Sequence, residues 1–355
     1  MKTQQRREAS GVDVNGSEIG GARALREYAT GERGRYSRVY LVDAHGPDRL
    51  VLDMAESHDA VLLPEGAQSS ASAADVFRYS GRLDEPGDEM FLAECTVELQ
   101  DYIAAAFVQL VGPTVVVVVD AAGRRAFLDD AELARRTGVF PSVLLDPRVV
   151  LANRSGLARP HEMHTPTAIR VRADGRFCVG MRGDVRGDIS SSPCEIGLPV
   201  PRGAASGDAS STDPFVDDHP TQGRLDRYLR AADLLKMLGA TDRATISGFG
   251  WRLLDDGGAD AEPRASAPFL LRTPTGFVLA EVDSRRRRAL SPFTAAVVDA
   301  TQTSASAELA GERLAGRLAI AASDARRLCH EARVALGIEF GASKTSGQAS
   351  KAVAR

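Results

Sequence analysis

Short hydrophobic runs alternate with amphipathic stretches through the first half of the chain. The runs are rich in Val, Ile and Leu and are bounded by Gly, Pro and Asp, a pattern typical of β-strands. In the last of them, Asp174 and Gly175 take the two central places of a hairpin turn. We predict strands at 37–44, 49–54, 60–66, 114–119 and 142–146, and a two-stranded hairpin over 167–183.

Two other stretches place apolar residues at the helical spacing of three or four. The longer one, 90–111, is ended by Gly112-Pro113. The other, 129–138, has acidic residues at its start, arginines in its last turn and a glycine at its end, which suits the helix dipole. We predict a helix over each stretch. Because strands and helices alternate, we expect an α/β domain of unassigned role over 35–190.

Segments poor in apolar residues divide the rest of the chain. Residues 1–34 are rich in Gly, Arg, Glu and Ser and show little periodicity, so we expect a flexible arm. The Gly-, Ser- and Pro-rich stretch 191–222 is expected to be a linker or a long loop, and 341–355 a disordered tail. An amphipathic helix is predicted over 223–239, with Gly239 as its C-cap.

The clearest pattern lies between residues 267 and 338. Two strands flank the turn TPTG, and RRRRAL is predicted to be a short third strand after the turn at Asp283-Ser284. Ser291-Pro292 then begin a helix as its N-cap and first residue. A second helix is predicted over 305–317 and a third from 323 to Gly337.

The predicted fold class is therefore α+β. An α/β-like amino-terminal domain precedes a carboxyl-terminal domain over 223–340, in which one helix is followed by three short strands and three helices.

Composition and charge limit the functions that the chain can have. The 355 residues carry a formal net charge of −4, and no apolar run is long enough for a membrane span or a secretion signal, so we expect a cytoplasmic protein that binds no membrane. Four cysteines without a CxxC pair fit reduced thiols. The segment 264–338 contains 11 Arg, no Lys and 7 acidic residues, and this local charge of +4 favours an anionic partner.

The same segment shows a family resemblance. GFVLAEVDSRRRRALSPFTAAVVDATQTSASAELAGERLA (276–315), followed by SDARRLCHEARVALGI (323–338), resembles the PqqD-like winged-helix module that binds the leader of ribosomally made, post-translationally modified peptides. The chain is most similar to the recognition proteins of daptide biosynthesis. The resemblance covers about a fifth of the chain. It departs from the family at the four arginines and at QTS (302–304), where the family often has an Asp-Gly turn.

The resemblance implies a non-catalytic adaptor with a winged helix-turn-helix. Such a module adds the leader peptide as an extra strand at an exposed sheet edge and presents it to modifying enzymes of the same pathway, without a cofactor or a metal. Arginine forks bind carboxylates, so an acidic leader would gain affinity and register. The peptide-binding residues that we expect are Arg286, Arg287, Arg288, Ala289 and Leu290 on the third strand, and Arg327, His330 and Val334 on the last helix. The side chains of Arg286 and Arg288 should point to one side of that strand and those of Arg287 and Ala289 to the other.

Other functions stay open. A winged-helix DNA-binding regulator would place 323–333 in the major groove, with Arg326 and Arg327 near phosphates or guanines, but the acidic total makes a nucleic-acid partner less favoured. The arginines could also be only a solvated surface. For an enzyme, HEMH at 161–164 with Cys178 and Cys194 offers metal-capable side chains, yet its spacing matches neither HExxH nor CxxC. We therefore predict no catalytic or metal site. A homodimer also stays open.

Overall fold

The first half of the chain forms one curled sheet of ten strands. The computed structural model describes residues 14–68, 71–190, 196–205, 219–239 and 244–343. The strand order is β11-β10-β9-β1-β2-β3-β4-β5-β6-β7. The strands are β1 (Val39–Val42), β2 (Ala60–Pro64), β3 (Asp75–Gly81), β4 (Glu89–Leu92), β5 (Cys95–Asp101), β6 (Thr114–Val117), β7 (Val149–Leu151), β9 (Ala168–Val171), β10 (Phe177–Val179) and β11 (Val185–Gly187). Strands β9, β1, β2 and β3 pair in parallel, and so do β5, β6 and β7.

Helices cover both faces of the parallel part of this sheet. Helix α1 (Val14–Thr30) packs on one face through Leu25 and Tyr28, and α2 (Asp48–Met54) packs on the opposite face through Val51. Successive side chains of a strand point to opposite faces, so a strand covered on both sides must be apolar throughout. This explains why all four residues of β1 are buried.

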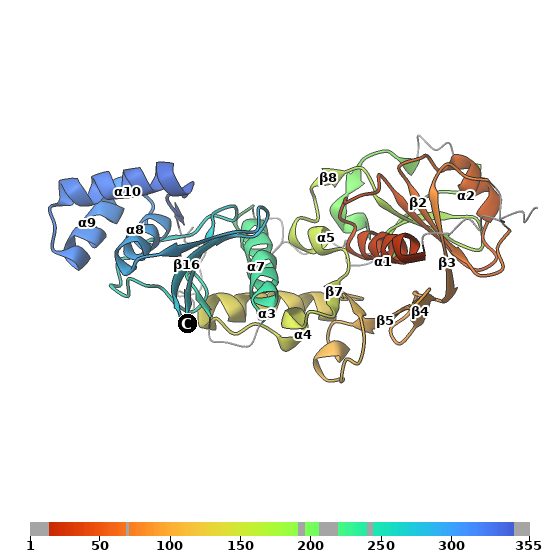
Figure 1. The fold of residues 1–355 in the computed structure, drawn as a ribbon, viewed down its shortest axis with the longest axis horizontal. Coiled ribbons are helices and arrows are strands. Elements are labelled where there is room, and N and C mark those ends of the chain that lie inside the picture. Colours follow the sequence, from red (N-terminus) through yellow and green to blue (C-terminus); the bar gives the residue numbers. More distant parts are fainter. Residues whose placement is uncertain (1–13, 69–70, 191–195, 206–218, 240–243, 344–355) are drawn as a thin grey trace, which may run out of the picture.

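A helical layer joins the sheet to the carboxyl-terminal unit (Figure 1). Its helices are α3 (Ala121–Thr137), α4 (Ser142–Leu145), α5 (Arg154–Ala158) and α7 (His219–Met237). Phe140 of this layer stacks on Tyr228 of α7, with ring centroids 5.5 Å apart. The same core includes Phe269 and Leu271 from the carboxyl-terminal strands. Helix α7 therefore packs against both halves of the protein.

The carboxyl-terminal unit is a four-stranded antiparallel sheet followed by three helices. The order is β13-β15-β16-β17. Its elements are β13 (Thr245–Ile246), β15 (Phe269–Thr273), β16 (Gly276–Glu281), β17 (Arg286–Leu290), α8 (Pro292–Gln302), α9 (Ala307–Leu318) and α10 (Ala322–Leu336). Leu270 and Leu279 face the three helices, and Phe269 and Ala280 face the core that contains α7. The smaller elements are η1 (Ala104–Ala106), β8 (Met163–His164), β12 (Val200–Pro201), β14 (Ala261–Glu262) and β18 (Ala342–Ser343).

The α+β class is confirmed, and so are several of its parts. The structure has strands near 39, 60 and 114 and a helix over most of 223–239, as predicted. The three strands and three helices of the carboxyl-terminal unit also follow one another in the predicted order. The hairpin of β9 and β10 also forms. Its i, i+3 hydrogen bond runs from the Gly175 N–H to the Arg172 C=O, 2.9 Å, so the central residues are Ala173 and Asp174, and Gly175 follows with φ +81°. Among the described residues, no helix is long and apolar enough to cross a membrane.

The helix predicted over 90–111 is wrong. This stretch forms β4, β5 and η1. Met90 and Leu92 alternate with exposed residues, as in a strand with one covered face, and Ala93 turns the chain with φ +52°. Apolar residues at two-residue spacing also recur at every fourth position, so the sequence fitted both periods.

Two predicted strands are helices. The runs 49–54 and 142–146 form α2 and α4, which are only one or two turns long. A short apolar run has no periodicity that separates a strand from a buried helix. The helix predicted over 129–138 begins earlier, at Ala121, because the Asp120 carboxylate accepts the Gly123 N–H at 2.8 Å and caps it there.

The flexible arm predicted over 1–34 is wrong for its described part. Residues 14–30 form α1, and residues 1–13 lie outside the description. Gly20 and Gly21, which lowered the helical signal, let α1 approach the sheet closely. A Cβ on Gly21 would lie 2.6 Å from a methyl carbon of Leu92.

The predicted linker and tail are partly described. In the linker 191–222, Ile196 is buried with α2, and β12 pairs with β8. In the tail 341–355, β18 pairs with β14. Residues 191–195, 206–218 and 344–355 of these segments lie outside the described chain, and α7 begins at 219.

Two glycines bring the helical layer and the carboxyl-terminal unit into backbone contact. Gly138 ends α3 with φ +74°, and Gly250, φ +64°, donates its N–H to the Arg135 C=O at 3.1 Å. A Cβ on Gly250 would lie 2.1 Å from the Thr137 carbonyl carbon. Only glycine fits this contact.

Gly250→Ala should destabilise the protein by about 2 kcal/mol more than Gly257→Ala. Gly257 has nearly the same φ, +65°, but nothing lies within 4 Å of its virtual Cβ, so it isolates the cost of backbone strain. Urea unfolding followed by the fluorescence of Trp251, the sole tryptophan, measures both. Equal losses in the two variants would show that the contact with Thr137 adjusts freely.

Candidate functional site

Strand β17 is the outermost strand of its sheet. It pairs only with β16, and four of its five residues are exposed. Every second residue of such a strand turns its N–H and C=O away from its neighbour. Within the described chain, these outward groups face no further strand. The edge therefore has free hydrogen-bonding capacity.

The register assigns each residue of β17 to a face. Arg288 lies opposite Leu279, and Leu290 lies opposite Phe277, which both face the three helices. Arg286, Arg288 and Leu290 therefore share the helix side, and Arg287 and Ala289 lie on the other side. The predicted alternation is present in the structure.

Helix α10 lies beside this edge. The Arg288 guanidinium donates to the Ala335 C=O in the last turn of α10, at 3.1 Å. Carbonyls at a helix C-terminus lack intrahelical partners and carry partial negative charge, so an arginine is well placed there. This hydrogen bond links the strand to the helix.

The predicted helix residues lie on the exposed face of α10. Arg327, His330 and Val334 are exposed and lie roughly opposite the buried face formed by Ala325 and Cys329. They form the outer ridge of α10.

Charge partners differ between the strand and the helix. Arg327 pairs with Glu331 at 3.0 Å and Asp324 at 3.5 Å on the surface of α10. Arg286, Arg287 and Arg288 have no carboxylate partner among the described residues. The three arginines of the edge strand are therefore available to an anionic ligand.

Contacts at both ends hold β17 in place. Asp283 in the preceding turn pairs with Arg230 of α7 at 2.9 Å. After the strand, the Ser291 Oγ accepts the Thr294 N–H at 3.1 Å, and Pro292 begins α8, as predicted. A fixed edge loses little entropy when a peptide pairs with it.

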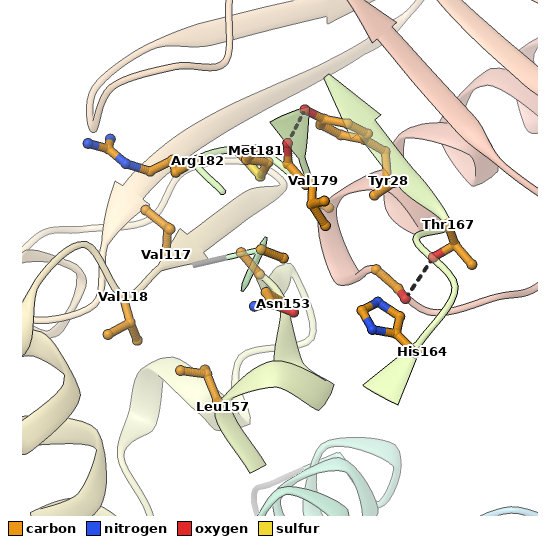
Figure 2. Close-up of a pocket in the computed structure, with 16 residues that line it drawn as sticks. Tyr28, Val117, Val118, Asn153, Leu157, His164, Thr167, Val179, Met181 and Arg182 are labelled. Carbon is orange, nitrogen blue, oxygen red and sulfur yellow. Dashed lines mark hydrogen bonds between the residues drawn. The ribbon is translucent and has the colours of Figure 1, made fainter. Parts of the chain in front are cut away.

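A small cavity in the amino-terminal half lies between Tyr28, Asn153, His164 and Met181 (Figure 2). Its volume is about 30 Å³, which suits one or two waters but no cofactor. His164 lies 3.1 Å from the Val200 C=O through Nδ1, and burial lowers the pKa of its imidazole. His161 is exposed, Cys178 is buried in β10 and Cys194 lies outside the described chain. No group of three possible metal ligands occurs in the described ranges.

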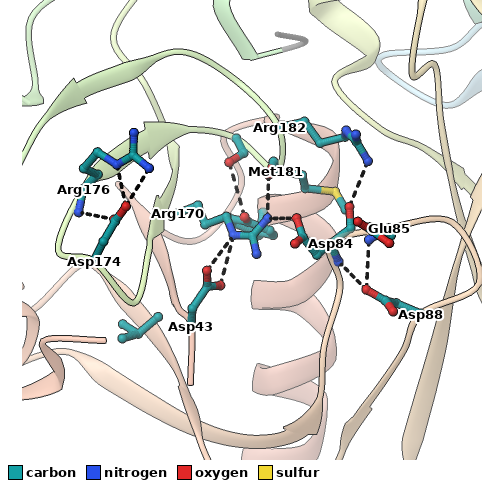
Figure 3. Close-up of polar contacts among 12 residues, drawn as sticks. Asp43, Asp84, Glu85, Asp88, Arg170, Asp174, Arg176, Met181 and Arg182 are labelled. Carbon is teal, nitrogen blue, oxygen red and sulfur yellow. Dashed lines mark hydrogen bonds and ion pairs between the residues drawn. The ribbon is translucent and has the colours of Figure 1, made fainter. Parts of the chain in front are cut away.

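A buried arginine network crosses the ends of β1 and β9 (Figure 3). The Arg170 Nε donates to both Asp43 oxygens, at 3.0 and 3.2 Å, and its Nη1 contacts Asp84 and the Met181 C=O. Burial raises the pKa of Asp43. Because these groups already satisfy one another, the network ties strands and loops together and leaves no obvious place for a ligand.

Comparisons of the chain with family models, with curated proteins and with solved structures give no significant match. The class of the protein is therefore described from its structure alone. It is an α+β protein with an arginine-bearing sheet edge beside a helix.

Proposed function

We propose that the chain is a cytoplasmic, non-catalytic adaptor. Its carboxyl-terminal strands and helices act as a PqqD-like winged helix-turn-helix that binds the leader of a ribosomally made precursor peptide and presents it to the modifying enzymes of a daptide-like pathway. The observation that carries the proposal is the free edge of β17 with its three arginines, which have no carboxylate partner among the described residues. An extended acidic peptide fits this edge, because its backbone pairs with the strand and its carboxylates with the guanidinium groups.

Peptide binding should depend on alternate amides of the leader. Successive N–H groups of a strand point to opposite sides, so only every second one pairs with β17. In a scan of single N-methylations through a leader peptide encoded beside this gene, affinity for the full chain should fall about 10-fold at every second position. Fluorescence anisotropy measures the affinities. A uniform effect along the peptide would contradict strand addition.

A DNA-binding regulator is the competing function. It would place α10 in the major groove, where phosphates surround the helix. Asp324 and Glu331 lie on the exposed surface of α10 and neutralise Arg327 there. This surface is a poor match for phosphates, and it favours the peptide over DNA.

A further inference from the structure

A groove of about 680 Å³ lies between α1 and the β4–β5 hairpin, beside the loop that leads to β6. Its apolar lining includes Ile19, Leu92, Val111 and Pro113. Ile19 is 62% exposed and Val111 81%, and Phe107 in the same loop is 85% exposed. Large apolar side chains gathered on a surface are costly to leave in water, and they commonly mark a protein contact.

Three glutamates, Glu89, Glu94 and Glu98, also line the groove. Glu89 and Glu98 are directly opposite each other in the β4–β5 pair. Like charges at such positions destabilise a sheet. Glu98 accepts a hydrogen bond from the Gln100 side chain, but in the described part of the chain none of the three carboxylates has a basic partner.

We propose that this groove docks a partner protein through a basic segment that also carries apolar side chains. The apolar lining needs a complement that a small cation lacks, and the carboxylates repel nucleic acid and acidic peptides. Lys or Arg side chains of the segment would relieve the repulsion between Glu89 and Glu98, while its apolar side chains would cover Ile19 and Val111.

The groove lies in the other half of the molecule from α9 and α10 (Figure 1). A partner bound there leaves β17 open. The charges of the two surfaces are opposite, so one ligand does not suit both. The inference depends only on the groove and stands without the proposed peptide function, although two separate surfaces are what an adaptor needs.

Cys95 lines the groove and reports its occupancy. Cys178 and Cys329 are only 1% and 0% exposed, so in the full chain with Cys194→Ser, alkylation by iodoacetamide follows Cys95. Burial raises the pKa of the Cys95 thiol, so the reaction is run at mildly alkaline pH. The probe is a synthetic peptide of alternating Lys and Leu, and its counterpart has Glu in place of Lys. We expect the Lys peptide to slow alkylation about 10-fold and the Glu peptide to have no effect.

Glu89→Gln with Glu98→Gln separates binding from folding. The double variant keeps the side-chain size and removes the repulsion between the two carboxylates. It should therefore weaken binding of the Lys peptide about 10-fold while raising the melting temperature of the protein. Glu56→Gln with Glu65→Gln makes the same charge change at exposed residues that do not line the groove, and it should bind the probe like the wild type.

Four results would overturn the proposal. The first is no protection of Cys95 by the Lys peptide, and the second is equal binding by the two double variants. The third is faster alkylation of the free protein after deletion of residues 1–13. That result would show that the chain's own amino-terminal segment occupies the groove in the full chain. The fourth is an alkylation rate of the free protein that depends on protein concentration. That result would show that a second copy of this chain, and not another protein, occupies the groove.

Discussion

Replacing Arg286 and Arg288 together with glutamate should weaken the binding of an acidic leader peptide to the full chain about 100-fold at low salt. Both side chains lie on the helix side of β17, beside the place that an added strand would take. The two substitutions replace the attraction between the arginines and the carboxylates of the peptide with repulsion. Anisotropy over a salt series tests the cause, because screening should raise the affinity of the variant and lower that of the wild type.

A second double variant controls for net charge. Arg317→Glu with Arg326→Glu makes the same change on exposed surfaces of α9 and α10, away from β17, and should retain peptide affinity within about 3-fold. Arg286→Glu alone keeps the hydrogen bond from Arg288 to Ala335, so a loss of about 10-fold there shows that charge rather than a displaced helix is responsible.

The two double variants also separate the competing functions. If both bind peptide equally, the edge strand is not the site. If duplex DNA displaces the peptide and the Arg317 and Arg326 substitutions abolish DNA binding, α10 acts as a recognition helix and the regulator function is favoured.

The carboxyl-terminal unit was predictable from sequence because its local signals agree with one another. Ser291 and Pro292 both mark the start of α8, and Gly337 ends α10 with φ +65°. Ser306 likewise caps α9 through the Leu309 N–H. Caps and turns are fixed by neighbouring residues, so a single sequence contains the information.

The amino-terminal half was less predictable because its elements depend on distant contacts. The buried face of helix α1 can be recognised only once the sheet that it covers is known. Its glycines are explained by the close approach of the helix to Leu92 in that sheet. The opposition of Glu89 and Glu98 exists only once β4 pairs with β5. Neither relation is visible until the pairing of the strands is known.

The same limit applies to the candidate site. The alternation along β17 follows from strand geometry and was predicted correctly. Which flank of α10 faces that strand depends on the angle at which the helix packs, and this angle is set by the shared core of α8, α9 and α10. The assignment of Arg327, His330 and Val334 to the wall of a peptide groove therefore stays a prediction.

Asp299→Ala should lower the free energy of unfolding of the carboxyl-terminal unit by about 3–5 kcal/mol. Asp299 is fully buried in α8, and its two oxygens accept from the Ser247 Oγ at 2.7 Å and from the Leu254 N–H at 2.9 Å. The substitution leaves two buried donors without a partner. Urea unfolding followed by Trp251, which lies in the loop between these donors, measures the loss.

Asp255→Ala is the matched control. Asp255 is exposed in the same loop region, so its removal should change the unfolding free energy by less than about 0.5 kcal/mol. A comparable loss in both variants would mean that the loop, rather than the buried carboxyl group, limits stability.

The pH dependence tests what the burial of Asp299 costs. Desolvation raises the pKa of its carboxyl group in the folded protein, although bonds from Leu254 and Ser247 oppose the shift. A folded-state pKa above the unfolded value means that the contribution of the group to stability is complete below the unfolded pKa and declines as the pH rises through the folded pKa. The stability advantage of the wild type over Asp299→Asn, which cannot titrate, should therefore shrink between acidic and neutral pH in urea titrations of both proteins. An advantage that grows with pH would show that the two hydrogen bonds and the nearby Arg313 outweigh desolvation, so that α8 holds a stabilised carboxylate.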